Sequence, residues 1–130
     1  MKNRLLIVCL FTVFAAGSAY ANTAQHEISQ ALMQAKQGSK AMSLQQVDTH
    51  LHRVVNCLVG QHGVGFDAGA GNPCMGKSAI NNFHGGRFDR DSLQQALGDA
   101  EYGLMTKHAK IARNAADLAV HSLAQAKAGD

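Results

Sequence analysis

Residues 43–60 read SLQQVDTHLHRVVNCLVG and contain the clearest helical signal in the chain. Ser43 and Gln46 have the spacing of a capping box, in which two side chains satisfy backbone N–H groups at a helix start. The apolar residues behind them share one helical stripe: Val47, Leu51, Val54, Val55 and Leu58. We therefore predict a helix that runs to about Val59, with Gly60 just past its end.

The segments on either side of this helix differ in their periodicity. Upstream, between Ala24 and Gln37, apolar residues recur at helical spacing until Gly38 and Ser39 interrupt the pattern, and we predict a first helix there. Downstream, residues 60–90 contain eight of the thirteen glycines and the sole proline, without any periodicity. We predict a long loop, which compact domains seldom contain unless it is functional or tied down.

A C-terminal helical segment follows, opened by Asp91 and Gln94 at capping-box spacing. Its apolar stripe includes a seven-residue repeat: Leu97, Leu104, Ile111 and Leu118. Such a repeat favours a long helix packed at a shallow angle against its neighbours. Gly98 and Gly103 each cost about 1 kcal/mol relative to alanine, so we expect either a bend there or two helices.

The N-terminus has the three parts of a secretory signal peptide. A basic start, MKNR, precedes the apolar run 5–16 and the small-residue cleavage site 19–21. The run is shorter than the roughly 20 residues that cross a bilayer. We expect a signal peptide over 1–21, one helical domain over 22–130, and a periplasmic or secreted protein.

Removal of the signal peptide would leave two cysteines, Cys57 and Cys74. In an oxidising compartment, an even pair in a small secreted chain predicts a disulfide. Closing the loop 57–74 would contribute about 3 kcal/mol to stability. A redox pair and a pair of metal ligands are the alternatives, and the long spacing disfavours a redox pair, which usually stands as Cys-x-x-Cys.

The chain shows neither a hairpin turn between alternating apolar residues nor a strand–helix–strand pattern. The predicted fold is therefore all-α. We expect a three- or four-helix up-and-down bundle with a long, glycine-rich loop over about 60–90, tethered by the disulfide.

Composition narrows the function classes. The signal peptide takes Lys2 and Arg4 with it, so twelve basic residues become ten against nine acidic ones, a net charge near +1. A near-neutral chain lacks the basic footprint of nucleic-acid binding. The sequence has no glycine-flanked nucleophile serine, no H-E-x-x-H and no Cys-x-x-Cys-His, so we expect neither an enzyme nor covalent haem.

Residues 71–78, GNPCMGKS, satisfy the phosphate-loop pattern G-x-x-x-x-G-K-[ST]. A phosphate loop needs a buried strand before it and a helix N-terminus after it. The preceding residues do not resemble a strand, and Pro73 removes one of the backbone amides that would hold the phosphates. We therefore expect no bound nucleotide.

All seven histidines lie outside the signal peptide: His26, His50, His52, His62, His84, His108 and His121. Neutral imidazole is the commonest metal ligand. On a helix, His50 and His52 point about 200° apart, so one metal ion takes both only where the backbone leaves helical geometry. Asp48 precedes His52 by four residues, and Asp117 precedes His121 by four. Each pair is either an exposed ion pair worth about 0.3–0.5 kcal/mol or half of a metal site.

A third candidate lies on the last helical segment. Glu101, Met105 and His108 share one helical face. Helical bundles build metal and haem sites from such inward-facing residues. The alternative is a histidine at the edge of the core whose ring is satisfied by a carbonyl group.

Four short stretches surround the two cysteines: THLH at 49–52, NCLVG at 56–60, GFD at 65–67 and GNPC at 71–74. Together they resemble a segment of a group of small uncharacterised secreted bacterial proteins, which implies that the Cys-to-Cys loop is a defined feature. More loosely, a helical chain with KHA at 107–109 and VHS at 120–122 resembles the small periplasmic metal-binding helical-bundle proteins. That resemblance implies metal binding.

The sequence leads to two hypotheses. In the first, an exported helical bundle binds a transition metal, Cu, Ni or Zn, through His50, His52 and His108, with His62, His84 and His121 as further candidates. In the second, the protein is a structural or interaction module with no metal role. The glycine-rich loop around Phe66 and Phe83 would then contact a protein partner.

Overall fold

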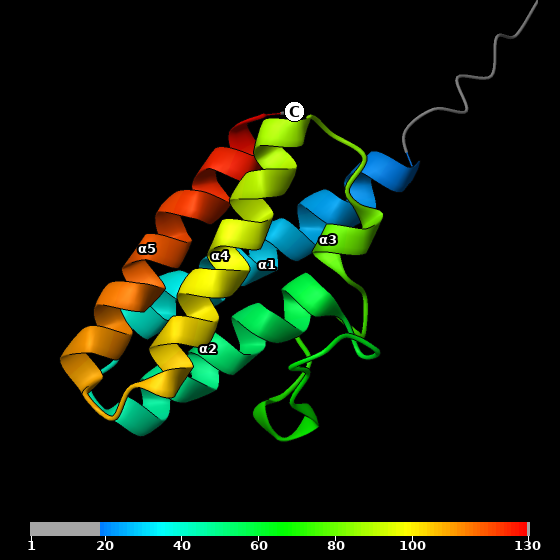
Figure 1. The fold of residues 1–130 in the computed structure, drawn as a ribbon. Coiled ribbons are helices and arrows are strands. Elements are labelled where there is room, and N and C mark those ends of the chain that lie inside the picture. The colour runs from blue at the N-terminus through cyan, green and yellow to red at the C-terminus, as the bar shows by residue number, and fades with distance from the viewer. Residues whose placement is uncertain (1–18, 130) are drawn as a thin grey trace, which may run out of the picture.

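The computed structural model describes residues 19–129, which form five α-helices and one short 3₁₀ helix (Figure 1). Their bounds are α1 (Ala19–Lys40), α2 (Leu44–Val59), η1 (Ala68–Ala70), α3 (Ala79–Asn82), α4 (Arg87–Met105) and α5 (Ala109–Ala128). No strand occurs within this range, so the all-α class is confirmed. The predicted signal peptide lies outside the described residues except for 19–21, which begin α1.

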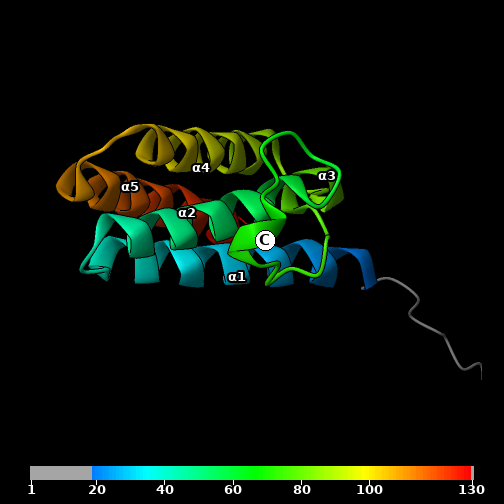
Figure 2. The ribbon, with the colours of Figure 1, turned by 90° about the horizontal axis from the view of Figure 1, so that it is seen from below.

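Short connections make two helical hairpins. Residues 41–43 join α1 to α2, and residues 106–108 join α4 to α5. The hairpins pack together through contacts of α1 with α5 and of α2 with α4. Figure 2 shows α3 and the glycine-rich loop together at one end of the long helices.

Helix α2 is the predicted helix with its predicted ends. Ser43 is the N-cap, and the reciprocal capping box with Gln46 is formed. Gly60 ends the helix at φ +74°, a left-handed conformation that favours glycine. The predicted apolar stripe is fully buried between α1 and α4. Local sequence signals and tertiary packing agree here.

Helix α1 continues through Gly38, where the sequence predicted a stop. A Cβ atom at position 38 would lie 3.2 Å from the Cβ of His50 and 3.4 Å from the Cβ of Ala116. The glycine therefore allows α2 and α5 to approach α1 closely. Its cost in helix propensity, about 1 kcal/mol, is offset by this packing.

The C-terminal prediction needs two corrections. Helix α4 begins at Arg87, four residues before the predicted start, with Gly86 as its N-cap. The break lies at residues 106–108 and not near Gly98 to Gly103. Thr106 there has an extended backbone, and its Oγ1 accepts a hydrogen bond from the N–H of His108 at 3.2 Å.

Half of the predicted seven-residue repeat contributes to the core: Leu97 and Leu104 on α4 are partly buried against it, and the two residues on α5 are not. Ile111 and Leu118 are 38% and 54% exposed. Helix α5 instead buries a face of small residues with one leucine: Ala112, Ala115, Ala116, Ala119, Ser122, Leu123 and Ala126. Alanine allows close contact with α4 and α1, so small side chains outweigh the more apolar repeat.

The loop is shorter and more ordered than predicted. It spans residues 60–86 and contains η1 and α3. The disulfide between Cys57 and Cys74 is present, as predicted, and both cysteines are fully buried. The phosphate-loop pattern leads into α3, which has only four residues and has Ser78 as its N-cap.

Candidate functional site

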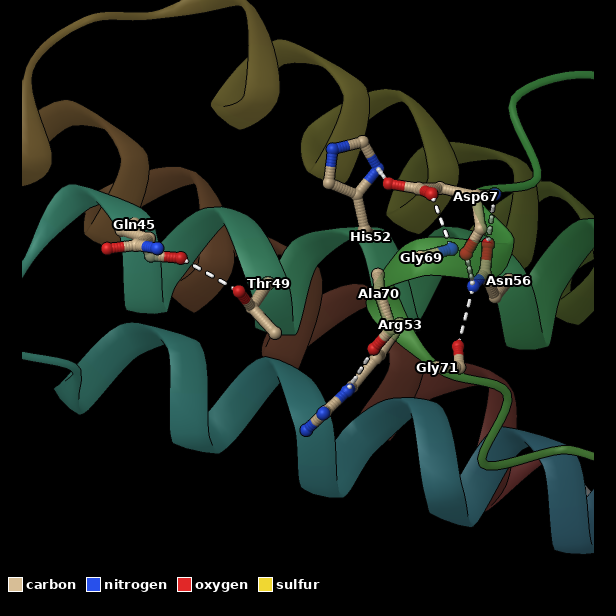
Figure 3. A network of polar contacts seen from close by, with 9 residues as sticks. All are labelled: Gln45, Thr49, His52, Arg53, Asn56, Asp67, Gly69, Ala70 and Gly71. Atoms are coloured by element: carbon tan, nitrogen blue, oxygen red, sulfur yellow. Dashed lines mark hydrogen bonds and ion pairs between the residues drawn. The ribbon is translucent and has the colours of Figure 1, made fainter.

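Asn56 on α2 fixes the first half of the loop. This side chain is fully buried. Its Oδ1 accepts from the N–H of Asp67 at 2.8 Å, and its Nδ2 donates to the carbonyls of Asp67 and Gly71, both at 2.7 Å (Figure 3). One amide thus satisfies three backbone groups of the loop, which buried polar groups require.

Two further residues of α2 hold the same segment. Arg53, one turn before Cys57, donates from Nε to the carbonyl of Ala70 at 2.7 Å (Figure 3). Cys57 forms the disulfide with Cys74. Arg53, Asn56 and Cys57 together hold residues 67–74 beside α2.

This anchoring creates a groove between α2 and η1, with a volume of about 520 Å³. Its lining comprises Leu44, Gln45, Asp48, Thr49, His52, Asp67, Gly69 and Ala70. His52 points toward Asp67, and its Nδ1 lies 3.7 Å from Asp67 Oδ2 (Figure 3). The other oxygen, Asp67 Oδ1, accepts from the N–H of Gly69 at 2.8 Å, which orients the carboxylate.

Two side-chain atoms at this groove are buried without a hydrogen-bond partner among the described residues. They are Oδ1 of Asp48 and Nδ1 of His52. Burial raises the pKa of Asp48, and the charges of His52 and Lys107 offset part of the rise. Buried polar atoms are usually paired, so an imidazole nitrogen and a carboxylate oxygen free of hydrogen bonds are notable.

His50 occupies a different side of α2. It is half-buried, and its Nδ1 lies 2.9 Å from Oε1 of Gln34 on α1. Burial and the charge of Arg53 lower the pKa of His50. A neutral ring that hydrogen-bonds a neighbouring helix fits a packing role between α1 and α2.

The other predicted ligands lie apart from this groove. His108 is the exposed N-cap residue of α5 and makes no side-chain capping bond. His62 is exposed beside Gln61, and their Nε2 atoms lie 3.0 Å apart. His84 is exposed in the segment between α3 and α4. His121 Nε2 lies 3.7 Å from Asp117 Oδ2 in a largely exposed pair on α5.

Across residues 19–129, no three His, Cys, Asp or Glu side chains are already gathered closely enough to hold a metal ion. The groove brings His52 to Asp67 and places Asp48 one turn away on α2. Chemically, it offers one imidazole nitrogen and the oxygens of two carboxylates.

The sequence analysis assigned no role of their own to Asn56, Arg53 and Asp67. Asn56 was identifiable in principle, because it interrupts an apolar run, and a polar residue inside such a run needs hydrogen-bond partners. Asp67 precedes Gly69 by two residues, the spacing of an aspartate turn. The sequence does not show that these residues meet.

No helix in the described range is long and apolar enough to cross a membrane. Comparison of the chain with protein-family profiles, with curated protein sequences and with solved structures gave no significant match.

Proposed function

We propose that this protein is an exported helical-bundle protein that binds a divalent transition metal in the groove between α2 and η1. The ligands are His52, Asp48 and Asp67. The predicted signal peptide and the Cys57–Cys74 disulfide support export, because disulfides persist in oxidising compartments.

The observation that carries the proposal is the contact of His52 with Asp67. Nδ1 of His52 faces Asp67 Oδ2 at 3.7 Å, too long for a hydrogen bond. Nδ1 is therefore left without a partner, as is Oδ1 of Asp48. The side chains of His52 and Asp67 are 35% and 43% exposed, while Nδ1 of His52 itself is buried.

The donor set indicates the metal class. One imidazole and two carboxylates without a thiolate suit Zn²⁺, Ni²⁺ or Cu²⁺ better than Cu⁺, which prefers sulfur ligands. Water would complete the coordination. Since Asp48 has to turn toward His52, we expect weaker binding than at a preformed site.

The positions of His50 and His108 in the fold explain why neither belongs to the proposed site. His50 already hydrogen-bonds Gln34 on another face of α2. His108 is exposed at the start of α5. A metal ion held by His52 would therefore draw its other ligands from Asp48 and the loop.

Native mass spectrometry of the mature, disulfide-bonded protein with Zn²⁺, Ni²⁺ or Cu²⁺ tests the proposal. We expect one metal ion per chain, lost in His52→Ala and in Asp67→Asn. Asp67→Asn retains a side-chain oxygen that can still accept the hydrogen bond from the N–H of Gly69 at the start of η1. The matched control is His121→Ala, which removes a His–Asp pair with the 3.7 Å separation of His52 and Asp67 and the four-residue spacing of Asp48 and His52. Equal losses in both histidine variants, or no adduct, would contradict the proposal.

The interaction-module hypothesis remains the second candidate because the anchored loop presents apolar side chains. Val64 and Met75 are 91% and 72% exposed. Met75 also has φ +52°, a left-handed conformation that non-glycine residues seldom adopt. Phe83 is only 2% exposed, so it belongs to the core and not to the contact surface predicted around it.

Site-specific crosslinking in the native compartment tests this second candidate. A photoreactive residue at position 64 should crosslink a defined protein partner, and one at the exposed position 118 of α5 should not. Disruption of the loop by removal of the disulfide should abolish the crosslink. Equal crosslinking at both positions would exclude the loop as a specific contact surface.

A further inference from the structure

A second groove lies on the outer face of α1, away from His52. Its volume is about 510 Å³. Six of its lining residues lie on α1 and one on α5: Ser29, Leu32, Met33, Lys36, Gln37, Lys40 and Lys127. Along α1, residues 29–40 extend over about 16 Å at the usual helical rise. The groove is therefore elongated, with a volume in the range of small-molecule sites.

Its lining combines an apolar floor with one sign of charge. Leu32 lies at the edge of the core, and Met33 is 43% exposed. Methionine is flexible and polarizable, and adapts to apolar ligands of varied shape. The charged side chains of the lining are three lysines, with no carboxylate among them.

These lysines come from two helices. Lys36 and Lys40 stand one turn apart on α1, and Lys127 lies in the last turn of α5. Among the described residues, no carboxylate forms an ion pair with any of the three ammonium groups. A groove lined by one sign of charge attracts ligands of the opposite sign.

We propose that this groove binds a single-chain amphipathic anion of the fatty-acid class. The alkyl chain lies along Leu32 and Met33, and the ammonium groups of Lys36 and Lys40, one turn apart on α1, hold the carboxylate. The length of this groove along α1, about 16 Å, matches that of one extended alkyl chain. A bilayer surface would instead favour a broad basic face with apolar side chains that insert into lipid. This inference is independent of the proposed metal site.

Isothermal titration calorimetry with dodecanoate, below its micelle concentration, tests the proposal on the disulfide-bonded protein. We expect saturable one-to-one binding that weakens at least tenfold in the double variant Lys36→Gln/Lys40→Gln. Met33→Ser should weaken binding through the apolar contact. Lys110→Gln, an exposed lysine of α5 outside the groove, is the matched control and should leave binding unchanged.

Three comparison ligands separate the alternatives. Dodecyltrimethylammonium has the same chain and a positive charge, and acetate has the carboxylate without the chain; neither should bind saturably. Vesicles of phosphatidylglycerol test a membrane surface as the source of anionic lipid. Binding to vesicles without binding of monomeric dodecanoate would overturn the proposal, as would dodecanoate binding that is unaffected by the lysine variants.

Discussion

Asn56 pairs with both backbone groups of Asp67, accepting from its N–H at 2.8 Å and donating to its carbonyl at 2.7 Å. The side-chain amide thus takes the place of a neighbouring backbone segment. A third bond, from Nδ2 to the carbonyl of Gly71, extends this pairing toward the disulfide. A loop with little regular structure thereby acquires a fixed position against α2.

Removing this amide should destabilise the protein substantially. Asn56→Ala leaves one N–H and two carbonyls of the loop without their partner, and buried polar groups left unsatisfied cost about 1–3 kcal/mol each. Because water can reach part of the loop, we expect a total loss of about 2–4 kcal/mol. Urea denaturation measures it, with Gln95→Ala on the exposed face of α4 as the control. Equal stabilities of the two variants would contradict the anchoring role.

Loss of the disulfide should loosen the loop more than the helices. The double variant Cys57→Ala/Cys74→Ala opens a closed loop of about 18 residues, for which the lost stabilisation is about 3 kcal/mol. We expect faster amide hydrogen exchange over residues 60–78 and little change in the α4–α5 hairpin. Reduced wild-type protein should behave in the same way. Uniformly faster exchange throughout the chain would show that the bridge supports the whole fold.

Two glycines of α4 provide an internal comparison of packing against helix propensity. A Cβ atom at Gly103 would lie 2.5 Å from Cδ1 of Leu51 and 3.0 Å from Cβ of Ala115, whereas one at Gly98 meets nothing within 4 Å. Gly98→Ala should therefore stabilise the protein by about 0.5–1 kcal/mol. Gly103→Ala should destabilise it by about 1–3 kcal/mol through overpacking. Thermal denaturation of both variants checks the signs, and a stabilising Gly103→Ala would disprove close contact there.

Glu27 on α1 should make the stability depend on pH. Its side chain is fully buried, and neither carboxylate oxygen forms a hydrogen bond of ordinary length and angle with a described residue. Burial raises the pKa of Glu27 above its ordinary value of 4.5, and nearby Asn82, Lys77 and His26 offset part of the rise. The folded protein then holds the proton more tightly than the unfolded chain. The resulting stabilisation is complete below about pH 4.5 and is lost as the pH rises through the pKa of the folded state.

Glu27→Gln keeps the shape of this side chain and removes its titration. We expect a smaller decline in the free energy of unfolding between pH 4 and pH 8, and a more stable protein at neutral pH. Asp48 and Asp99, whose pKa values burial also raises, should leave a residual decline. Urea denaturation across this range measures the effect. Glu101→Gln, at an exposed position of α4, is the control, and identical pH profiles for the two variants would refute the role of Glu27.

Local signals in the sequence were sufficient for α2, for the helical class and for the Cys57–Cys74 bridge. Ser43 and Gln46 close a capping box within one turn, and Gly60 ends the helix in a conformation that glycine favours, so neither end depends on distant residues. The two cysteines left only one possible pairing once the signal peptide was set aside. These predictions rest on short-range chemistry or on simple counting.

Tertiary structure alone decided the rest. Gly38 looked like a helix stop, yet α1 continues through it, and the missing Cβ leaves room for the close approach of His50 and Ala116. Ile111 and Leu118 looked like core residues, yet both are exposed, and the buried face of α5 consists mainly of its alanines. The groove between α2 and η1 likewise depends on contacts between residues that are far apart in the sequence. His52 and Asp67 are fifteen residues apart and meet because Asn56 pairs with the loop backbone, a relationship that periodicity and spacing do not encode.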